Sequence, residues 1–346
     1  MKKLVVFLAF VFVLVSSQSS FAAYKWRAVT HSSPGTEQLR IFEEFADTVK
    51  VLSKGELVID VFAAGVLFPV FETFDNVANG VVDASMVFSA YWTGKDPVFN
   101  FSTRPGCPIG TFAEAAYLDQ QLEKWWSKLY AKHGLKYLGY MEESPIYEQL
   151  MSRVPLRSMA DLKGKKIRTS GFSAMYYRSM GATTVSLSGP EIYTAFQTKN
   201  IDAAEYTFWD ENMKMGFHEV VKYVVDPALH NGTCDYAPLV VNPKKWEELP
   251  QHLKDVVIVA RDRARFSSAM ILVDEMKARE KWKAMPGMEI IRWSDKDLKD
   301  ARALGMKMIL DESNKSAEGK EFVKIYSKTL FELGYKDEAK VLGYKK

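Results

Sequence analysis

Two segments of the chain, 119 residues apart, follow one pattern. They are Glu72 to Ala84 (ETFDNVANGVVDA) and Glu191 to Ala203 (EIYTAFQTKNIDA). In each, an acid near the start of a helix precedes apolar core positions, a polar break and a short stretch that leads into a strand. The repeat predicts two similar α/β domains, with a chance similarity of two helix-to-strand junctions as the alternative. A chain of 346 residues is also longer than one hydrophobic core usually holds.

Hydrophobic periodicity defines elements at both ends of the chain. Tyr24 to Thr30 alternates as a strand does, Glu37 to Leu52 repeats apolar residues at helical spacing, and Glu56 to Phe62 alternates again. This order is the start of a βαβ unit. Further helices are predicted around Asp297 to Asp311 and Ser316 to Leu333.

The segment from Gln251 to Met285 contains neither glycine nor proline and is bounded by Pro250 and Pro286. Its apolar residues form a broad helical face, so we expect one helix of about 50 Å at about 1.5 Å per residue. Such a helix is longer than a small domain and should span both domains. A coiled coil is the alternative, yet no sustained heptad is visible.

No low-complexity linker interrupts the chain, so we expect strands that cross between the two domains. The first domain is assigned residues 24–145 and about 233–255. The second is assigned residues 146–232 and about 286–346, and residues 251–285 form the spanning helix.

The first 22 residues have the pattern of a secretory signal peptide. Two lysines precede an apolar run from Leu4 to Val15, and Ser20 and Ala22 suit cleavage after Ala22. The run is too short for a membrane-spanning helix of about 20 residues, with a retained anchor as the alternative. Residues 1–22 hold two lysines and no acid, so cleavage lowers the formal net charge from +3 to +1, which argues against a nucleic-acid partner. We expect a periplasmic protein that is not embedded in the membrane.

Cys107 and Cys234 are the cysteines of the chain. In an oxidising compartment they could form a disulfide, but the sequence does not decide whether they meet. It leaves the oligomeric state open as well.

Catalytic motifs are incomplete. Gly171-Phe172-Ser173-Ala174-Met175 resembles a nucleophile elbow whose final glycine is replaced by Met175. His218-Glu219-Val220-Val221-Lys222 resembles the start of a zinc-protease helix whose second histidine is replaced by Lys222. We therefore expect no enzyme, with Ser173 as a helix cap. A secreted serine hydrolase that uses Ser173 with His218 or His230 is the alternative.

Arg168 ends the segment Asp161-Leu162-Lys163-Gly164-Lys165-Lys166-Ile167-Arg168, which is typical of a loop that leads into a strand. Folds of the α/β class bind ligands at the carboxyl ends of strands, and the planar guanidinium suits a carboxylate. Arg168 is therefore the candidate ligand anchor, with a surface ion pair as the alternative.

The same segment is the most specific mark of a resemblance to the solute-binding proteins of tripartite ATP-independent periplasmic (TRAP) transporters, the DctP-type family. The resemblance covers the chain after residue 22 and includes Leu57 to Phe62, Asn79 to Ala84 and Gln251 to Met285. It implies two α/β domains that close on an organic acid whose carboxylate pairs with Arg168. It also implies delivery of that acid to the membrane subunits of a TRAP transporter.

Within this family the chain resembles binders of 2-oxo and 2-hydroxy monocarboxylates such as pyruvate or lactate. Tyr91-Trp92-Thr93-Gly94-Lys95-Asp96-Pro97 and Ala204-Glu205-Tyr206 carry this likeness. In those relatives a Glu-Trp pair and an upstream Gln help to hold a cation that bridges to the ligand. Here Glu205 matches the acid, Tyr206 replaces Trp, and the Gln position falls near Tyr147. The resemblance thus implies a Na⁺ or Ca²⁺ site at Glu205 and Tyr206, with a hydrogen bond from a substrate hydroxyl to Glu205 as the alternative.

After Asp226-Pro227 the aromatic pair of those relatives is replaced by Leu229-His230, followed by Asn231. We therefore expect a ligand more polar than pyruvate, with a hydroxy-sulfonate or a C4-dicarboxylate as alternatives. A ligand-gated sensor domain is an alternative function. The predicted ligand-binding residues are Ser33, Tyr91, Trp92, Tyr147, Arg168, Glu205, Tyr206, Trp209, His230 and Asn231.

Overall fold

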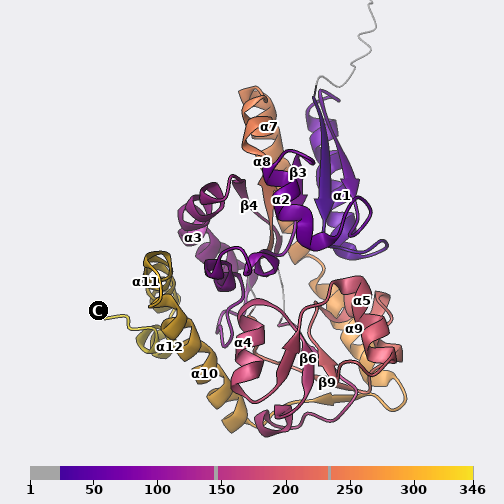
Figure 1. Cartoon of the computed structure of the whole chain (residues 1–346), viewed down its shortest axis with the longest axis vertical. Helices are drawn as coiled ribbons and strands as arrows, with labels where there is room; N and C mark the ends of the chain where they lie inside the picture. Colours follow the sequence, from indigo (N-terminus) through magenta and orange to yellow (C-terminus); the bar gives the residue numbers. More distant parts are fainter. Residues whose placement is uncertain (1–23, 144–146, 233–234, 346) are drawn as a thin grey trace, which may run out of the picture.

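The structure, a computed structural model, describes residues 24–143, 147–232 and 235–345. Figure 1 shows two lobes, each built around its own sheet. The predicted signal peptide and Cys234 lie outside the described residues, so signal cleavage and the pairing of Cys107 with Cys234 stay predictions. Within the described ranges, no helix combines the length and the apolar character that a membrane span requires.

The sheet of the first domain has the strand order β2-β1-β3-β10-β4. β1 pairs in parallel with β2 and β3, and β10 runs antiparallel between β3 and β4. The predicted opening βαβ unit is confirmed, and Thr36 caps its helix by accepting from the backbone N–H of Leu39. The elements are β1 (Tyr24–Thr30), α1 (Glu37–Leu52), β2 (Leu57–Phe62), η1 (Val70–Glu72), α2 (Thr73–Ala78), β3 (Ala84–Met86), η2 (Ser89–Trp92), η3 (Pro97–Ser102), α3 (Phe112–Lys132), β4 (Lys136–Glu143), β10 (Asp235–Val241) and α7 (Pro243–Glu247).

The sheet of the second domain has the strand order β11-β9-β5-β8-β6-β7. Here β6 pairs in parallel with β7 and β8, and β5 runs antiparallel between β8 and β9. The elements are β5 (Leu150–Ser152), η4 (Met159–Leu162), β6 (Lys166–Arg168), α4 (Gly171–Ser179), β7 (Thr183–Val185), α5 (Gly189–Gln197), β8 (Ala203–Ala204), α6 (Trp209–Lys214), η5 (Phe217–Glu219), β9 (Tyr223–Val225) and β11 (Glu289–Ile291).

The two sheets share one topology, which confirms the fold class predicted from the repeat. The order β2-β1-β3-β10-β4 matches β7-β6-β8-β5-β9 strand for strand and in the direction of every pairing, and β11 adds a sixth strand to the second sheet beside β9. The repeated segments form α2 with β3 in the first sheet and α5 with β8 in the second. β10 returns to the first sheet after β9 and β11 to the second, so the chain crosses between the sheets as expected.

The prediction of a single helix over Gln251 to Met285 is wrong. The segment forms α8 (Gln251–Ala269) and α9 (Leu272–Ala284), which are interrupted at Met270 and Ile271. α8 packs on α1 and β4 of the first domain, whereas α9 packs on α6 of the second. The two helices therefore pack on different domains, while Val259, Phe266, Leu272, Val273 and Met276 stay exposed, and no glycine or proline marks the break.

The assignment of residues 286–346 to the second domain is wrong for the last helices. The predicted helices are present as α10 (Asp295–Ser313) and α11 (Ala317–Glu332), followed by α12 (Lys336–Val341). α11 packs on α3, and Phe322 stacks on Phe101 at 4.4 Å between ring centroids. Figure 1 shows α10 leaving the second lobe and running up to α11 and α3. An apolar stripe predicts that a helix packs, but not which surface it covers.

Candidate functional site

Arg168 is the last residue of β6, and only 2% of its surface is exposed. Its Nε donates to the carbonyl of Leu187 at 2.9 Å, and its Nη1 donates to the carbonyl of Glu205 at 2.7 Å. The same Nη1 lies 3.4 Å from the Glu205 carboxylate. The backbone of the second domain thus fixes the guanidinium, and the alternative of a surface ion pair is wrong because the pair is buried.

Two tyrosines enclose this guanidinium. Tyr91, in η2 of the first domain, accepts a hydrogen bond from Nη2 of Arg168 at 3.3 Å. The ring centroid of Tyr206 lies 5.3 Å from the guanidinium carbon, a favourable arrangement for a cation. Gly189, at the start of α5, leaves room for this ring, because a Cβ there would lie 2.2 Å from the Tyr206 hydroxyl oxygen. Groups from both domains therefore meet at Arg168.

Glu205 follows β8 directly and is 4% exposed. Its Oε1 accepts a hydrogen bond from the backbone N–H of Ser170 at 3.2 Å. Burial raises the pKa of Glu205, Arg168 lowers it, and the neighbouring Glu148 raises it further. A positive charge between the two carboxylates would favour their ionised forms.

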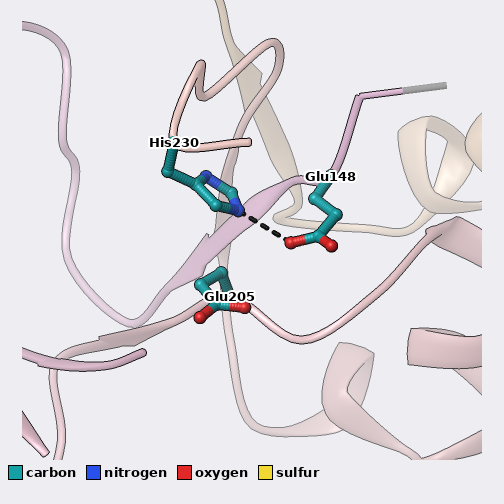
Figure 2. A group of neighbouring side chains, drawn as sticks. All are labelled: Glu148, Glu205 and His230. Carbon is teal, nitrogen blue, oxygen red and sulfur yellow. Dashed lines mark hydrogen bonds and ion pairs between the residues drawn. The ribbon is translucent and has the colours of Figure 1, made fainter. Parts of the chain in front are cut away.

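Glu148, Glu205 and His230 point toward one another (Figure 2). One donor atom from each lies within 4.8 Å of the other two, and all three side chains are buried. Nε2 of His230 lies 2.9 Å from Oε2 of Glu148. Burial lowers the pKa of His230 to about 4, so the imidazole is neutral at neutral pH. Two carboxylates and a neutral imidazole form a donor set that could hold a metal ion.

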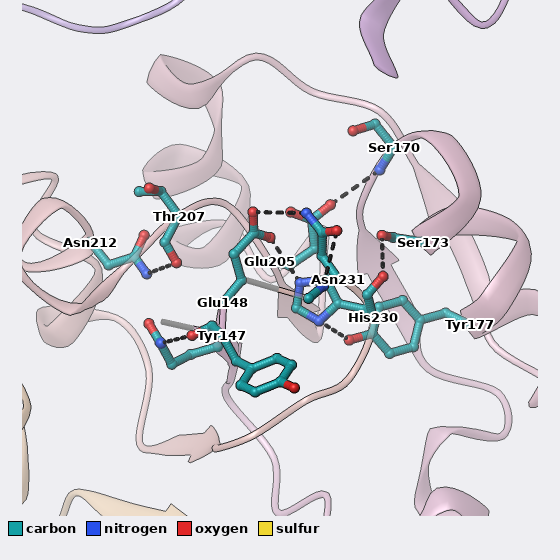
Figure 3. A network of polar contacts seen from close by, with 12 residues as sticks. Tyr147, Glu148, Ser170, Ser173, Tyr177, Glu205, Thr207, Asn212, His230 and Asn231 are labelled. Carbon is teal, nitrogen blue, oxygen red and sulfur yellow. Dashed lines mark hydrogen bonds and ion pairs between the residues drawn. The ribbon is translucent and has the colours of Figure 1, made fainter. Parts of the chain in front are cut away.

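Neighbouring side chains orient this donor set (Figure 3). The Tyr177 hydroxyl lies 2.9 Å from Nδ1 of His230. The Ser173 hydroxyl donates to the backbone carbonyl of His230 at 2.9 Å, and Nδ2 of Asn231 donates to Oε1 of Glu148 at 3.5 Å. Such outer contacts fix the orientation of metal-binding side chains.

The predicted site residues divide into two groups. The structure brings one group of predicted residues together at Arg168 and at the carboxylates of Glu148 and Glu205. This group is Tyr91, Arg168, Glu205, Tyr206, His230 and Asn231. It does not bring Trp92 and Trp209 to Arg168. Trp92 packs on Phe74 in the core of the first domain, and Trp209 packs on Trp282 at 5.8 Å. Both tryptophans therefore serve packing in this structure.

Two more predicted residues lie in connecting segments. The Tyr147 hydroxyl donates to the carbonyl of Cys107 at 3.2 Å, which directs the ring away from Glu148. The buried hydroxyl of Ser33, in the loop after β1, makes no hydrogen bond within the described part of the chain. A role for either residue in ligand binding stays a prediction, as does a role for Tyr206 in holding a cation.

Sequence reasoning missed Glu148 and His31. Glu148 lies in a connection between the sheets, where no periodicity marks it. His31 directly follows β1, its Nδ1 lies 3.2 Å from the carbonyl of Met86, and its ring lies 6.2 Å from that of Tyr91. Burial lowers the pKa of His31 to about 4, and the charge of Arg168 contributes. Ligands of α/β folds bind at the carboxyl ends of strands, and this rule predicts a site role for Arg168 at the end of β6. Applied to β1, which holds the matching position in the first sheet, the same rule selects His31.

A cavity of about 370 Å³ lies between the domains beside Tyr91. Its lining comes from both domains and includes Tyr91, Asn100, Thr169, Ser170, Arg178 and Ser186. Cavities of this size accept small-molecule ligands, and the hydroxyl and amide groups of this lining suit a polar one.

The geometry disfavours the hydrolase alternative. Ser173 lies inside α4, whose N-cap is Ser170, so the prediction that Ser173 caps the helix is wrong. Its hydroxyl donates to the backbone carbonyl of His230 and not to the ring. The ring of His218 packs on Trp282 at 5.9 Å. A serine nucleophile requires a base within hydrogen-bond reach of its hydroxyl, and these contacts do not provide one.

The chain is similar to several characterised proteins. It is 28% identical over 283 residues to the 2,3-diketo-L-gulonate-binding periplasmic protein YiaO of Escherichia coli, covering 80% of this chain and 83% of that protein. A TRAP transporter solute-binding protein from Bordetella bronchiseptica, solved with copurified calcium and picolinate, has a TM-score of 0.83 at 23% identity. That match covers 90% of this chain and 93% of the other.

A TRAP periplasmic solute-binding protein from Pseudoalteromonas atlantica, solved with sodium and pyruvate, has a TM-score of 0.79 at 22% identity. It covers 93% of this chain and 99% of its own. Both structural matches share the two-domain fold described above. The profile of the DctP family, bacterial extracellular solute-binding proteins of family 7, matches residues 28–315. The chain therefore belongs to the DctP family of solute-binding proteins.

Proposed function

We propose that the protein is a periplasmic receptor that captures a small organic acid between its domains and delivers it to the membrane subunits of a TRAP transporter. The observation that carries this proposal is the burial of Arg168 between the domains, with Tyr91 from one and Glu205 from the other at its guanidinium. A buried arginine that contacts both domains can bind an anion and can also stabilise the closed form.

The carboxylate of the ligand is expected to meet the guanidinium where the Tyr91 hydroxyl and the Glu205 carboxylate approach it. The backbone carbonyls of Leu187 and Glu205 accept hydrogen bonds from Nε and Nη1 of Arg168. The guanidinium is therefore already ordered before the ligand binds. Preorganisation of this kind lowers the entropic cost of binding.

A cation is expected to join the ligand to the protein. Glu205 would repel an anionic ligand, and two carboxylates in one buried site repel each other, unless positive charge lies between them. Glu148, Glu205 and His230 supply the donor atoms for such an ion. The calcium and sodium in the two structural relatives support this part of the proposal.

The ligand class is expected to be a 2-oxo or 2-hydroxy acid, because such acids offer a carboxylate to Arg168 and a second oxygen to an ion. Pyruvate, in one relative, belongs to this class, and YiaO is named for a diketo sugar acid. The polar side chains of His230 and Asn231 beside Glu148 support a ligand that carries more hydroxyl or oxo groups than pyruvate.

A thermal-shift panel tests the proposal. Pyruvate, lactate, sugar acids, hydroxy-sulfonates and C4-dicarboxylates are added to the protein, because a ligand that binds only the folded state raises its melting temperature. We expect a shift from at least one 2-oxo or 2-hydroxy acid and none from neutral sugars. If sugars or amino acids raised the melting temperature and no acid did, the ligand class would be wrong.

A further inference from the structure

Glu148, Glu205 and His230 form a donor set of mixed chemistry. They come from three separate connections of the second domain: before β5, after β8 and after β9. Their exposed fractions are 3%, 4% and 0%. A metal with bonds of about 2.1 Å holds its donor atoms about 3 to 4 Å apart, and the observed spread of up to 4.8 Å is close to this range.

We propose that His230 Nε2 is a direct metal ligand and that the site selects a divalent ion of the zinc, cobalt or nickel type over Na⁺ and Ca²⁺. This inference rests on the proposed function for the ligand that completes the site, and it specifies the ion. Imidazole nitrogen suits zinc and its neighbours in the first transition series, whereas calcium is bound almost entirely by six to eight oxygen atoms.

The charges of the site favour a divalent ion. Glu148, Glu205 and a monoanionic ligand carry three negative charges between them. Arg168, with its Nη1 3.4 Å from Glu205, supplies one positive charge, and a divalent ion supplies the other two. A monovalent ion would leave one negative charge uncompensated in a buried site, which is costly.

The imidazole is already positioned for this role. When Nε2 binds a metal, the neutral ring carries its proton on Nδ1, and the Tyr177 hydroxyl 2.9 Å away can accept it. The hydrogen bond from Ser173 to the His230 carbonyl fixes the backbone that carries the ring. Metal-binding histidines commonly have such an outer partner on the second nitrogen.

Glu148 is positioned by a hydrogen bond from the side chain of Asn231, the residue that follows His230. Asn231 donates to Oε1 of Glu148, and Oδ1 of Asn231 in turn accepts from the backbone N–H groups of Arg104 at 3.2 Å and Gly232 at 3.1 Å. Because Arg104 belongs to the first domain, the orientation of Glu148 depends on both domains. The alternative is that His230 and Glu148 are only a buried hydrogen-bonded pair, with Nε2 donating to the carboxylate at 2.9 Å.

The test titrates chelator-treated protein with Zn²⁺, Co²⁺ or Ca²⁺ alone, without organic acid. Calorimetry gives affinity and stoichiometry, and the visible spectrum of Co²⁺ reports its coordination. We expect one Zn²⁺ or Co²⁺ per chain, bound at least about tenfold more tightly than Ca²⁺. His230→Gln should weaken Zn²⁺ and Co²⁺ by about 10- to 100-fold and leave Ca²⁺ within about threefold. His218→Gln, which changes a half-buried imidazole that packs on Trp282 outside the donor set, should leave all three affinities within about threefold.

X-ray absorption at the zinc edge of the unmodified protein keeps the proposal falsifiable even if His230→Gln fails to fold. We expect scattering from one imidazole. Tighter binding of Ca²⁺ than of Co²⁺, an all-oxygen zinc environment, or unchanged Co²⁺ affinity in folded His230→Gln would each overturn it. Because these measurements use the metal alone, they can fail while the acid still binds Arg168, and the failure of either proposal can be recognised separately.

Discussion

The Tyr91 hydroxyl of the first domain lies 3.3 Å from Nη2 of Arg168 in the second domain and accepts its hydrogen bond. The phenol thus joins the candidate ligand anchor to the opposite domain. Thr103 of the first domain reinforces the contact, since its hydroxyl accepts from the backbone N–H of Phe172 at 2.9 Å. The contacts that join the two domains therefore include the candidate ligand anchor.

Replacing Arg168 should abolish tight binding. Removal of one partner from a buried charged pair costs about 2 to 5 kcal/mol, so Arg168→Ala should weaken affinity by at least about thirtyfold. Arg168→Lys keeps the charge but loses the planar fork, and we expect it to restore only part of the affinity. Calorimetry on variants whose thermal unfolding stays cooperative checks this. An Arg168→Ala protein that binds the acid normally would remove Arg168 from the site.

Tyr91→Phe should weaken binding without removing it. The ring remains, but the closed form loses one hydrogen bond, worth about 0.5 to 1.5 kcal/mol, so affinity should fall about two- to tenfold. Small-angle scattering with saturating acid should still show the compact form. If affinity fell as far as in Arg168→Ala, the Tyr91 hydroxyl would contribute more to binding than its one hydrogen bond to Arg168 explains.

Gly171→Ala should hold the domains apart. Gly171 has φ +58°, and a Cβ there would lie 2.8 Å from the Cβ of Ala90 and 3.0 Å from the Thr103 hydroxyl in the opposite domain. We expect at least about a tenfold loss of affinity and a more expanded protein in scattering.

Gly164→Ala is the matched control for this variant. Gly164 has φ +76°, but a Cβ there meets nothing within 4 Å. The substitution carries the same kind of backbone strain, about 1 kcal/mol of stability, without a clash between the domains. Equal losses of affinity in the two variants would show that the strain and not the clash matters.

Ligand affinity should fall as pH rises from about 5 to 8. Glu211, in α6 of the second domain, faces the first turn of α1 in the first domain. Burial raises the pKa of Glu211 from 4.5 to about 8. The backbone N–H groups of Gln38 and Glu37 and the charge of Lys214 lower the pKa, whereas Asp210 raises it. Burial and Glu211 itself likewise raise the pKa of Glu142 on β4, whose carboxylate accepts from Gln38.

The sign follows from the state that binds the proton. Once the domains open, Glu211 returns toward its ordinary pKa, so between about pH 4.5 and 8 only the closed form keeps the proton. Acid therefore stabilises closure, and each pH unit of increase in this window should cost up to about tenfold in affinity per group. Calorimetry in buffers of different ionisation enthalpy should detect proton uptake on binding.

Glu211→Gln should flatten this pH profile. Glu275→Gln is the control, because burial also raises the pKa of Glu275 to about 8, but its carboxylate accepts from the Asp210 N–H within the second domain. Opening should not expose Glu275, so this variant should keep the pH dependence of affinity. If Glu211→Gln left the pH dependence of affinity unchanged, the proton taken up on binding would belong to a group other than Glu211.

The sequence predicted the parts of the fold that local patterns determine. Alternation and helical spacing located β1, α1 and β2, and the repeat located β3 and β8. The break at Met270 was not predictable, because it depends on which domain each half of the segment meets. For the same reason the apolar stripe of α11 did not show that it covers α3.

The candidate site was predictable only at strand ends. Arg168 ends β6 and Glu205 follows β8, and the strand-end rule selects both. Glu148 lies in an irregular connection, and its role is visible only once His230 and Glu205 are seen around it. Trp92 and Trp209 were predicted to bind the ligand, but both lie in hydrophobic cores, where large aromatic side chains serve packing.

Native mass spectrometry with a panel of organic acids tests the central claim most directly, because it reports the mass of whatever the protein holds. We predict that the unmodified protein retains one 2-oxo or 2-hydroxy acid per chain, and that Arg168→Ala, folded by thermal unfolding, retains none. An unmodified protein that retains no acid, or an Arg168→Ala variant that retains it equally well, would contradict capture of an organic acid by Arg168.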